Sequence, residues 1–333
     1  MPLTLTRAID AVLDGEDVAA LRRATGRLIE TYRSGAPPEA RVLRDPASAA
    51  AYAAYRMPAT HAAVSRALRM GLDTGAALPV RSLVDLGGGT GAAAWAAAEA
   101  FPELVAVTVV DGSPDALDRG RRIAAHGPSP VAGARWFRAT LEAGAVVAPA
   151  DLVTVSYVLG ELEPATQASV VDAAAASAGL VLVVEPGTPR GFAAVLAARE
   201  RLVAAGWHLV APCPQDGSCP VAARPGDWCH FSVRLDRTAL HRRLKGAELG
   251  HEDEKFSFVL ASRAAVGERA PRVLRHPVRR KGLVRLEVCR PDGTAGPEVV
   301  TRRNRPAYRV ARDADWGSAL RSPEPSATGS ADT

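Results

Sequence analysis

A run of alternate glycines between an apolar segment and an alanine-rich segment is the feature that most constrains this chain. Residues 82–86 form the apolar segment, which has β character, and the glycines follow it directly: Gly87, Gly89 and Gly91. Residues 92–100 are mostly alanine and have high helix propensity. Glycine lets the backbone turn tightly and lie against a ligand, and a helix N-terminus offers free N–H groups. The run therefore predicts a strand, a turn and a helix, which begin a nucleotide-binding βαβ unit.

A second predicted strand, residues 105–111, ends in Asp111, which lies 20 residues after Gly91. An acid at this position can accept hydrogen bonds from both ribose hydroxyls of an adenosine. The glycines also fit G-x-G-x-x-A with Ala92, so a dinucleotide cofactor remains an alternative. With Asp85 the run becomes D-x-G-x-G-x-G, which resembles the first motif of class I methyltransferases and implies S-adenosylmethionine, with the leading acid near its amino-acid moiety. The predicted cofactor-binding residues are Asp85, Gly87, Gly89, Gly91, Asp111 and Ser156.

Apolar strands and helices continue to alternate as far as residue 205. Near-continuous apolar strands separated by helices predict a parallel sheet that is buried on both faces. Ligands of such sheets bind over the carboxyl ends of the strands. These ends are predicted at Leu86, Asp111, Thr140, Ser156 and Glu185.

The fourth predicted strand carries no recognisable catalytic signature. Many amino-group methyltransferases have Asn/Asp-Pro-Pro-aromatic at this place, whereas this chain has Ser-Tyr-Val-Leu-Gly-Glu at residues 156–161. Tyr157 and Glu161 are weak candidates for lining a substrate pocket, and a structural role fits them equally well. Because methyl transfer depends mostly on alignment of the nucleophile with the sulfonium, the missing base does not exclude activity. Apart from these weak candidates, the sequence identifies no catalytic residue.

The pattern divides the chain into four parts of an α/β protein, with a Rossmann-like class I methyltransferase sheet at its centre. Residues 1–80 are predicted to be helical, with Asp45 as an N-cap and a helix from residue 47 to 70 interrupted near Pro58. Residues 81–265 form the sheet domain, with a Cys-rich metal-binding insertion at 208–231. Residues 266–318 form a small basic β appendage, with a last predicted strand at 308–311. Residues 319–333 are predicted to be a disordered tail.

The net charge of +5 is unevenly distributed. Residues 230–312 contain 20 Lys and Arg but 9 Asp and Glu, a net charge of +11, so the rest of the chain carries −6. The predicted RNA-binding residues lie in two basic runs: Arg279, Arg280, Lys281, Arg302, Arg303 and Arg305. A concentrated basic face favours a polyanionic partner, and a merely solvated surface is the alternative.

Two further features bear on location. The sequence contains no charge-free apolar stretch of about 18 residues, so no membrane span is predicted. The first ten residues lack the layout of a signal peptide. We therefore expect a cytoplasmic protein without a membrane partner.

The chain has four cysteines: Cys213, Cys219, Cys229 and Cys289. Three of them lie within 17 residues of a loop rich in proline and glycine. In a cytoplasmic protein such a cluster seldom forms disulfides. Four thiolates suit a tetrahedral zinc site or a cubane iron–sulfur cluster, and the spacing differs from the paired C-x₂-C of zinc ribbons, which favours the cluster. His208 and His230 are further candidate ligands. The alternative to a metal site is that the four cysteines are buried and unrelated.

Three segments resemble the methyltransferase-like proteins of the small ribosomal subunit, which occur in mitochondria and bacteria. They are residues 185–192 (EPGTPRGF), the cysteine loop with residues 227–231 (DWCHF), and residues 251–258 (HEDEKFSF). The resemblance runs from about Tyr52 to Trp316. It implies a class I methyltransferase fold, association with small-subunit rRNA and a four-iron [4Fe-4S] cluster on the four cysteines. It also implies a role in small-subunit assembly.

Three functional hypotheses follow. The first is an S-adenosylmethionine-binding iron–sulfur protein that acts on the small ribosomal subunit as an rRNA methyltransferase. The second is a non-catalytic assembly factor that binds rRNA and uses the cofactor fold as a scaffold. The third is a small-molecule methyltransferase with a structural zinc site.

Overall fold

The computed structural model describes residues 3–34, 45–142, 147–245 and 249–321. Its centre is an eight-stranded sheet with the order β3-β2-β1-β4-β5-β8-β6, and β7 pairs with β8 outside this path. The strands are β1 (Ser82–Leu86), β2 (Ala106–Asp111), β3 (Arg135–Arg138), β4 (Ala150–Ser156), β5 (Ala178–Pro186), β6 (His208–Ala211), β7 (Phe231–Asp236) and β8 (His251–Ser262). Strands β1 to β5 are parallel, and β8 is antiparallel to β5, β6 and β7. The predicted Rossmann-like sheet is thereby confirmed.

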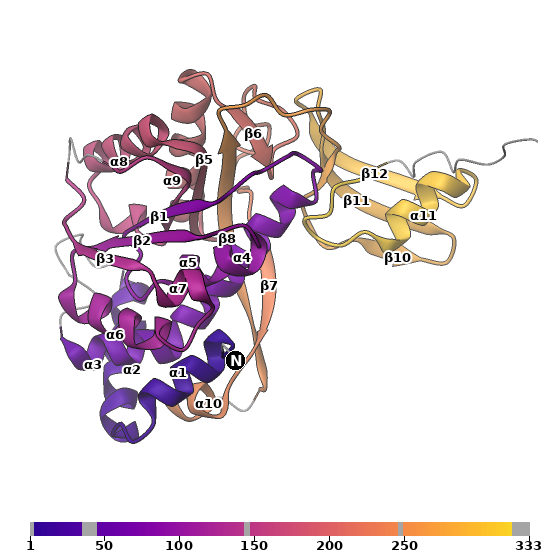
Figure 1. Cartoon of the computed structure of the whole chain (residues 1–333). Coiled ribbons are helices and arrows are strands. Elements are labelled where there is room, and N and C mark those ends of the chain that lie inside the picture. The colour runs from indigo at the N-terminus through magenta and orange to yellow at the C-terminus, as the bar shows by residue number, and fades with distance from the viewer. Residues whose placement is uncertain (1–2, 35–44, 143–146, 246–248, 322–333) are drawn as a thin grey trace, which may run out of the picture.

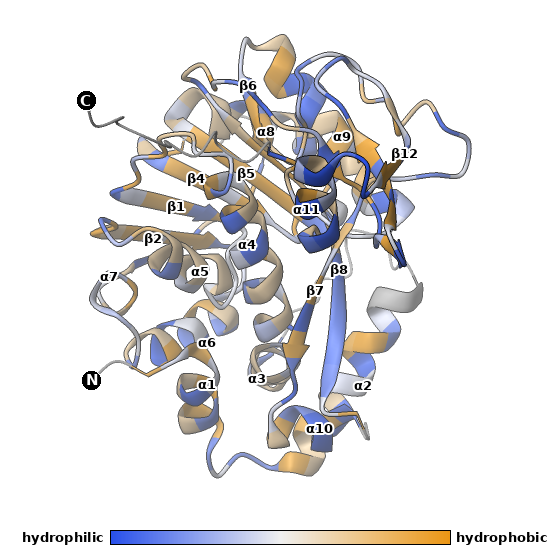
Figure 2. Ribbon diagram, turned by 90° about the vertical axis from the view of Figure 1, so that its right-hand side faces the viewer, coloured by the Kyte–Doolittle hydropathy of each residue, from blue (hydrophilic) through white to orange (hydrophobic). Residues whose placement is uncertain are grey.

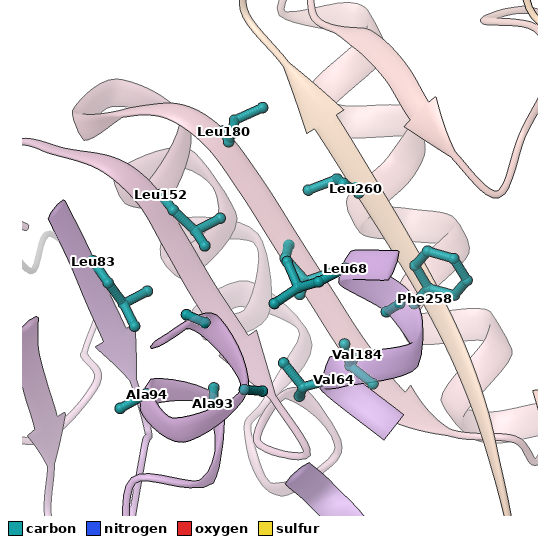
Figure 3. Close-up of a cluster of buried hydrophobic side chains, with 14 of the residues drawn as sticks. Val64, Leu68, Leu83, Ala93, Ala94, Leu152, Leu180, Val184, Phe258 and Leu260 are labelled. Carbon is teal, nitrogen blue, oxygen red and sulfur yellow. The ribbon is translucent and has the colours of Figure 1, made fainter. Parts of the chain in front are cut away.

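Helices cover both faces of this sheet (Figure 1). On one face lie α4 (Met57–Leu72) and α5 (Ala92–Ala100), and on the other lie α8 (Pro164–Ser177) and α9 (Pro189–Ala204). Figure 3 shows Leu68 of α4 among strand residues of the first face, including Leu152. Successive side chains of a strand point to opposite faces, so Leu152 and Val153 belong to different buried clusters. The prediction of a sheet buried on both faces is confirmed.

The N-terminal region is helical, as predicted. Its helices are α1 (Leu5–Leu13), α2 (Val18–Ser34), α3 (Pro46–Tyr55) and α4. Asp45 caps α3, because its carboxylate accepts a hydrogen bond from the Ser48 N–H at 2.6 Å. The interruption expected near Pro58 lies at Arg56 instead, since a proline in the first turn of α4 removes no helical hydrogen bond. None of the helices in the described parts of the chain is long and apolar enough to cross a membrane.

The remaining helices are short or peripheral. They are α6 (Pro114–Ala124), α7 (Ser129–Ala132), the 3-10 turn η1 (Leu159–Glu161) and α10 (Ala239–Lys245). The C-terminal appendage contains a separate antiparallel sheet, which projects from the main body in Figure 1. Its elements are β9 (Arg272–Val273), β10 (Val278–Arg280), β11 (Leu283–Cys289), β12 (Ala295–Thr301) and α11 (Arg305–Asp313).

Two expectations about the appendage are corrected. The strand predicted at 308–311 is wrong, because this segment belongs to α11, which Figure 2 colours mostly hydrophilic. The Asn304 side chain caps that helix, and the positions packed on the small sheet recur every three residues, at Tyr308, Ala311 and Ala314. Residues 319–321, predicted as the start of a disordered tail, instead continue the pairing, since Ala319 forms a bridge with Arg272. Residues 322–333 of the predicted tail lie outside the described residues.

One glycine substitution tests the packing of α9. A Cβ on Gly191 would lie 2.0 Å from the Pro186 carbonyl oxygen, whereas a Cβ on Gly26, in α2, would meet nothing within 4 Å. We expect Gly191→Ala to lower the free energy of unfolding by about 1–3 kcal/mol. Gly26→Ala, the matched control, should raise it by about 0.5–1 kcal/mol, because alanine is the better helix former. Urea unfolding measures both, and equal effects would contradict the predicted packing.

Candidate functional site

The glycine turn after β1 has a backbone that side chains tolerate poorly. Gly87, Gly89 and Gly91 have φ values of 66°, 52° and 84°, in the region that favours glycine. A Cβ on Gly87 would lie 2.5 Å from Val158 Cγ2, and one on Gly91 would lie 2.8 Å from the Trp136 ring. The three predicted glycines therefore form a turn of left-handed backbone, and Gly87 and Gly91 pack against the loop after β4 and against β3.

Asp111 stands at the end of β2, where the sequence places it, and its carboxylate faces the glycine turn. Oδ2 accepts a hydrogen bond from the Gly89 N–H at 2.9 Å, and Oδ1 accepts one from the Ser113 N–H at 2.7 Å. Burial raises the pKa of Asp111, against the effect of these backbone hydrogen bonds. Asp111 therefore holds the turn in shape, and its carboxylate oxygens keep further lone pairs for ligand hydroxyls.

Asp85 is almost completely buried, with 1% of its surface exposed. Its Oδ1 accepts a hydrogen bond from the Thr154 hydroxyl at 2.7 Å, while Oδ2 has no hydrogen-bond partner among the described residues. Oδ2 lies at the turn, since a Cβ on Gly88 would be 2.5 Å from it. Burial raises the pKa of Asp85 to about 7. An unsatisfied carboxylate oxygen at this place could accept a hydrogen bond from an ammonium group of a ligand.

The loop after β4, whose last residue is the buried Ser156, is held by the neighbouring strand β5. Glu185 lies near the end of β5, and its Oε1 accepts hydrogen bonds from the Val158 and Leu159 N–H groups at 3.0 and 2.8 Å. Burial raises the pKa of Glu185 to about 7. Glu161, in η1, is exposed overall, yet desolvation of its carboxyl and then the charges of Asp111 and Glu185 raise its pKa to about 7. These acids gather at the strand ends, as the sheet topology predicts.

Tyr157 is constrained rather than free. Its φ is 58°, and its hydroxyl donates a hydrogen bond to Glu254 Oε1 at 2.9 Å. Arg56 forms an ion pair with the same carboxylate at 3.1 Å. Burial, followed by the charge of Glu254, raises the pKa of Tyr157 well above 10. Tyr157 therefore stays protonated at neutral pH.

The structure brings the four cysteines to one cavity. Three come from the loop between β6 and β7 and one from the end of β11: Cys213, Cys219, Cys229 and Cys289. All are free. Burial raises the pKa of Cys213, raises that of Cys229 well above 9, and raises that of Cys289 to about 12. Metal binding to thiols releases protons, so the cavity offers neutral thiols that a metal centre would convert to thiolates.

Neither candidate histidine lines this cavity. His208 contacts Asp216 at 3.5 Å, and His230 stacks on Trp228 with 5.2 Å between the ring centroids. In the described parts of the chain, no three His, Cys, Asp or Glu side chains are grouped closely enough to hold a single metal ion.

The sequence does not single out two buried arginines that lie beside the cysteines. Arg199 of α9 lines the cavity with 4% of its surface exposed, and Arg272 of β9 is 3% exposed. Arg272 lies opposite Cys289 in the β9–β11 ladder. Burial lowers the pKa of Arg272 to about 10, so it still carries its charge at neutral pH. No sequence pattern marks either residue, because their role depends on contacts between distant segments.

The two basic runs meet at one end of the appendage. The Arg302 N–H donates to the Gly282 carbonyl oxygen at 3.1 Å, so the turn after β10 lies beside the turn after β12. The exposed cations on or near these turns without an ion-pair partner among the described residues are Arg280, Lys281, Arg285, Arg302, Arg303, Arg305 and Arg309. We call this set the basic cluster. Arg279 differs, because its guanidinium contacts the Ala314 carbonyl and Asp315.

Comparison with known proteins identifies relatives of this chain. The model of the family described as mitochondrial small ribosomal subunit Rsm22 matches residues 46–321. The human mitochondrial ribosome assembly protein METTL17 is 31% identical over 296 residues, which cover 83% of this chain. The chain spans 63% of the length of that relative. Rsm22-cox11 tandem protein 2 of Schizosaccharomyces pombe, also named as mitochondrial, is 26% identical over 180 residues, covering 42% of this chain and 24% of that protein.

Solved structures with a similar fold include two methyltransferases. An O-methyltransferase family protein from Burkholderia thailandensis has a TM-score of 0.41 and 16% identity, covering 76% of this chain and 74% of that one. The magnesium protoporphyrin IX methyltransferase of Synechocystis, with bound S-adenosylmethionine, has a TM-score of 0.38 and 14% identity, covering 72% and 97%.

The buried Asp85 carboxyl gives a pH-dependent prediction. Its pKa is about 7 in the folded chain and about 3.9 when unfolded. Between these values the folded state keeps a proton that the unfolded state has lost, so the free energy of unfolding falls by about 1.4 kcal/mol per pH unit. The Asp85→Asn variant lacks this titrating carboxyl, so its free energy of unfolding does not fall for this reason. The stability of the variant relative to the natural chain should therefore rise from pH 4 to 7 and then stay level.

Urea unfolding at several pH values measures this difference. Thr154→Val is the control, because it removes the hydrogen bond to Asp85 but keeps the carboxyl, and so keeps the decline with pH. Parallel stability profiles for Asp85→Asn and the natural chain would contradict the prediction.

Proposed function

The chain belongs to the Rsm22 family of mitochondrial small ribosomal subunit proteins, and from this we propose that it acts on the small ribosomal subunit and its rRNA. Its finer activity, in this proposal, is that of an S-adenosylmethionine-dependent rRNA methyltransferase that carries a [4Fe-4S] cluster. The observation that carries the proposal is the basic cluster, whose cations lack carboxylate partners in the described structure. Such cations are available to neutralise phosphates.

The residues at the strand ends fit S-adenosylmethionine. The glycine turn brings its backbone to the ends of the strands, and Asp111, beside it, could accept hydrogen bonds from ribose hydroxyls. The unsatisfied Asp85 Oδ2 suits the ammonium group of the methionine moiety. Bound S-adenosylmethionine supplies an electrophilic methyl group. The chain itself would bind and orient the cofactor and the target atom.

A second candidate function is that of a non-catalytic assembly factor. It is favoured by Tyr157, whose hydroxyl is hydrogen-bonded to Glu254 and whose raised pKa keeps it protonated at neutral pH. It also agrees with the name of the human relative, a ribosome assembly protein. Methyl transfer to purified small-subunit rRNA, measured with labelled S-adenosylmethionine, separates the two functions. The predicted cytoplasmic location stays a prediction, and both named relatives are mitochondrial.

The cysteine cavity supports the metal centre in this proposal. In a cubane each iron binds its own thiolate, so the four sulfurs line a cavity instead of converging on one point. Three thiols of the main domain and one of the appendage share such a cavity. A centre bound by all four would therefore join the appendage to the main domain across a long loop.

The cofactor assignment predicts the effect of two substitutions. Gly89→Val places a branched side chain at a φ of 52°, and Asp111→Ala removes the acceptor for both the turn and the ribose. We expect both to abolish S-adenosylmethionine binding by calorimetry while the sheet remains folded by circular dichroism. Gly267→Val is the control, because a Cβ there meets nothing within 4 Å. If the natural chain binds NAD and not S-adenosylmethionine, the cofactor assignment is wrong.

The basic cluster predicts a salt-dependent affinity for rRNA. Replacing Arg280, Lys281 and Arg302 by Ala should weaken binding and reduce the slope of log affinity against log salt by up to about three. The control replaces three arginines of the main domain that already have carboxylate partners: Arg122, Arg201 and Arg234. Filter binding to small-subunit rRNA between low and high salt measures both. An equal slope for the two triple variants would show that the basic cluster is only solvated.

The metal centre predicts the composition of the purified protein. Protein purified without oxygen should be brown, with iron and sulfide near four per chain, the count of a cubane on four cysteines. Cys289→Ser should lose the centre and loosen the appendage, which limited proteolysis after about residue 265 would detect. If the purified protein is instead colourless and contains one zinc ion, the metal centre is a zinc site, as in the third hypothesis.

A further inference from the structure

Two buried arginines beside the cysteine cavity have no carboxylate to pair with. A guanidinium stays protonated at physiological pH, and buried charges in proteins are normally paired or bound to an ion. Arg199 and Arg272 are 4% and 3% exposed, and within the described ranges neither forms an ion pair; both donate hydrogen bonds to backbone carbonyl oxygens. The Cys213 thiol is the strongest electrostatic partner of both arginines, whereas the Glu200 and Asp73 carboxylates act on them without forming an ion pair in the described structure. Their charges are therefore left largely uncompensated.

Arg199 forms part of the wall of the cavity. Its Nη2 donates to the Gln215 carbonyl oxygen at 3.4 Å and to the Gly217 carbonyl oxygen. Its Nε is buried and has no hydrogen-bond partner in the described structure. Buried donors in folded proteins are almost always satisfied. An unused donor on the wall of a cavity therefore marks a position for an acceptor.

Arg272 reaches the same centre from the appendage. It lies opposite Cys289 in the β9–β11 ladder. Its Nε donates to the carbonyl oxygen of Pro212, the residue before Cys213, at 3.1 Å, and its Nη1 donates to that of Gly317 at 2.9 Å. The Arg272 side chain thus links the β9–β11 ladder, which contains Cys289, to the loop that contains Cys213.

The charge of a four-thiolate centre matches these two cations. Four thiolates around a core of charge +2, whether one zinc ion or an oxidised four-iron cluster, leave a net charge of about −2. We infer that Arg199 and Arg272 are the counter-charges of this centre: they neutralise it and retain it, and Arg199 Nε donates a hydrogen bond to one of its sulfur atoms. The inference rests on the metal centre proposed above. Both arginines are positioning residues, since the thiolates are the ligands.

The test compares metal retention in the full chain, purified without oxygen. Arg199→Met removes the charge and the donor, whereas Arg199→Lys keeps the charge. Arg119→Met is the matched control, because Arg119 is also buried but pairs with Glu16 at 2.9 Å. Competition with bathophenanthroline for iron, or with pyridylazoresorcinol for zinc, should show binding about 10–100-fold weaker in Arg199→Met. Arg199→Lys should lose less, and Arg119→Met should match the natural chain.

Arg272 is tested by the pair Arg272→Met and Arg272→Lys. If both variants are purified as folded protein, only Arg272→Met should lose the metal at low chelator concentration. If Arg272→Met fails to fold, retention of metal by Arg272→Lys supports the role of the charge, and loss of metal from it counts against that role.

Thermal unfolding with and without metal separates charge from packing. With metal, Arg199→Met should melt below the natural chain. After metal removal it should melt at the same temperature or higher, because the substitution then removes an uncompensated buried charge. Equal destabilisation in both forms, or unchanged metal retention, overturns the inference and leaves the metal centre intact. A natural chain that carries no metal overturns both.

Discussion

Strand β8 hydrogen-bonds with three other strands, and the positions of both candidate sites depend on it. Its first half pairs with β7, and its second half lies between β5 and β6. A buried backbone group without a partner is costly, so these ladders fix β5 and β6 relative to each other. Glu185, near the end of β5, lies in the candidate cofactor site, and β6 leads into the cysteine loop. The Ser257 hydroxyl of β8 also donates to the Cys229 carbonyl oxygen at 2.8 Å, which ties the loop back to the sheet.

Buried charges of opposite sign are segregated between the two sites. The strand ends hold acids with raised pKa values, among them Asp85 and Glu185, whereas Arg199 lines the cysteine cavity and Arg272 is buried beside Cys289. Each group is costly to bury alone. In the function proposed above, the acids of the first site would face a cofactor that carries a sulfonium and an ammonium group. The arginines of the second would face a metal centre held by thiolates.

Local chemistry made much of the fold predictable. The glycine turn, the Asp45 cap and the apolar strands each depend on residues close in sequence, and all of them were predicted correctly. The helix α11 was missed because Tyr308 and Val310 favour a strand. Only the Asn304 cap together with the three-residue spacing of the packed positions indicates a helix. The four cysteines could be grouped from their number and chemistry. Their common cavity is a finding of the structure, because Cys289 comes from the appendage.

The roles of the charged residues could not be predicted, because a charge in a sequence carries no record of its partner. Arg279 and Arg280 are neighbours in one basic run, yet Arg279 contacts Asp315 and Arg280 has no ion-pair partner among the described residues. Alternation along β10 explains the difference, since successive side chains leave a strand on opposite faces. Arg199 and Arg272 are more extreme examples. Neither lies in a basic run, and both donate hydrogen bonds to other segments of the chain.

The hydrogen bond from the Arg302 N–H to the Gly282 carbonyl oxygen has an evolutionary consequence. It joins two turns through their backbones, so the two basic runs meet whichever side chains the turns carry. Arginine and lysine can then replace each other, and a cation can move to a neighbouring position, without dispersing the positive surface. An insertion or deletion in either turn would separate the runs. Selection should therefore preserve the lengths of these two turns more strictly than the identity of any single basic residue within them.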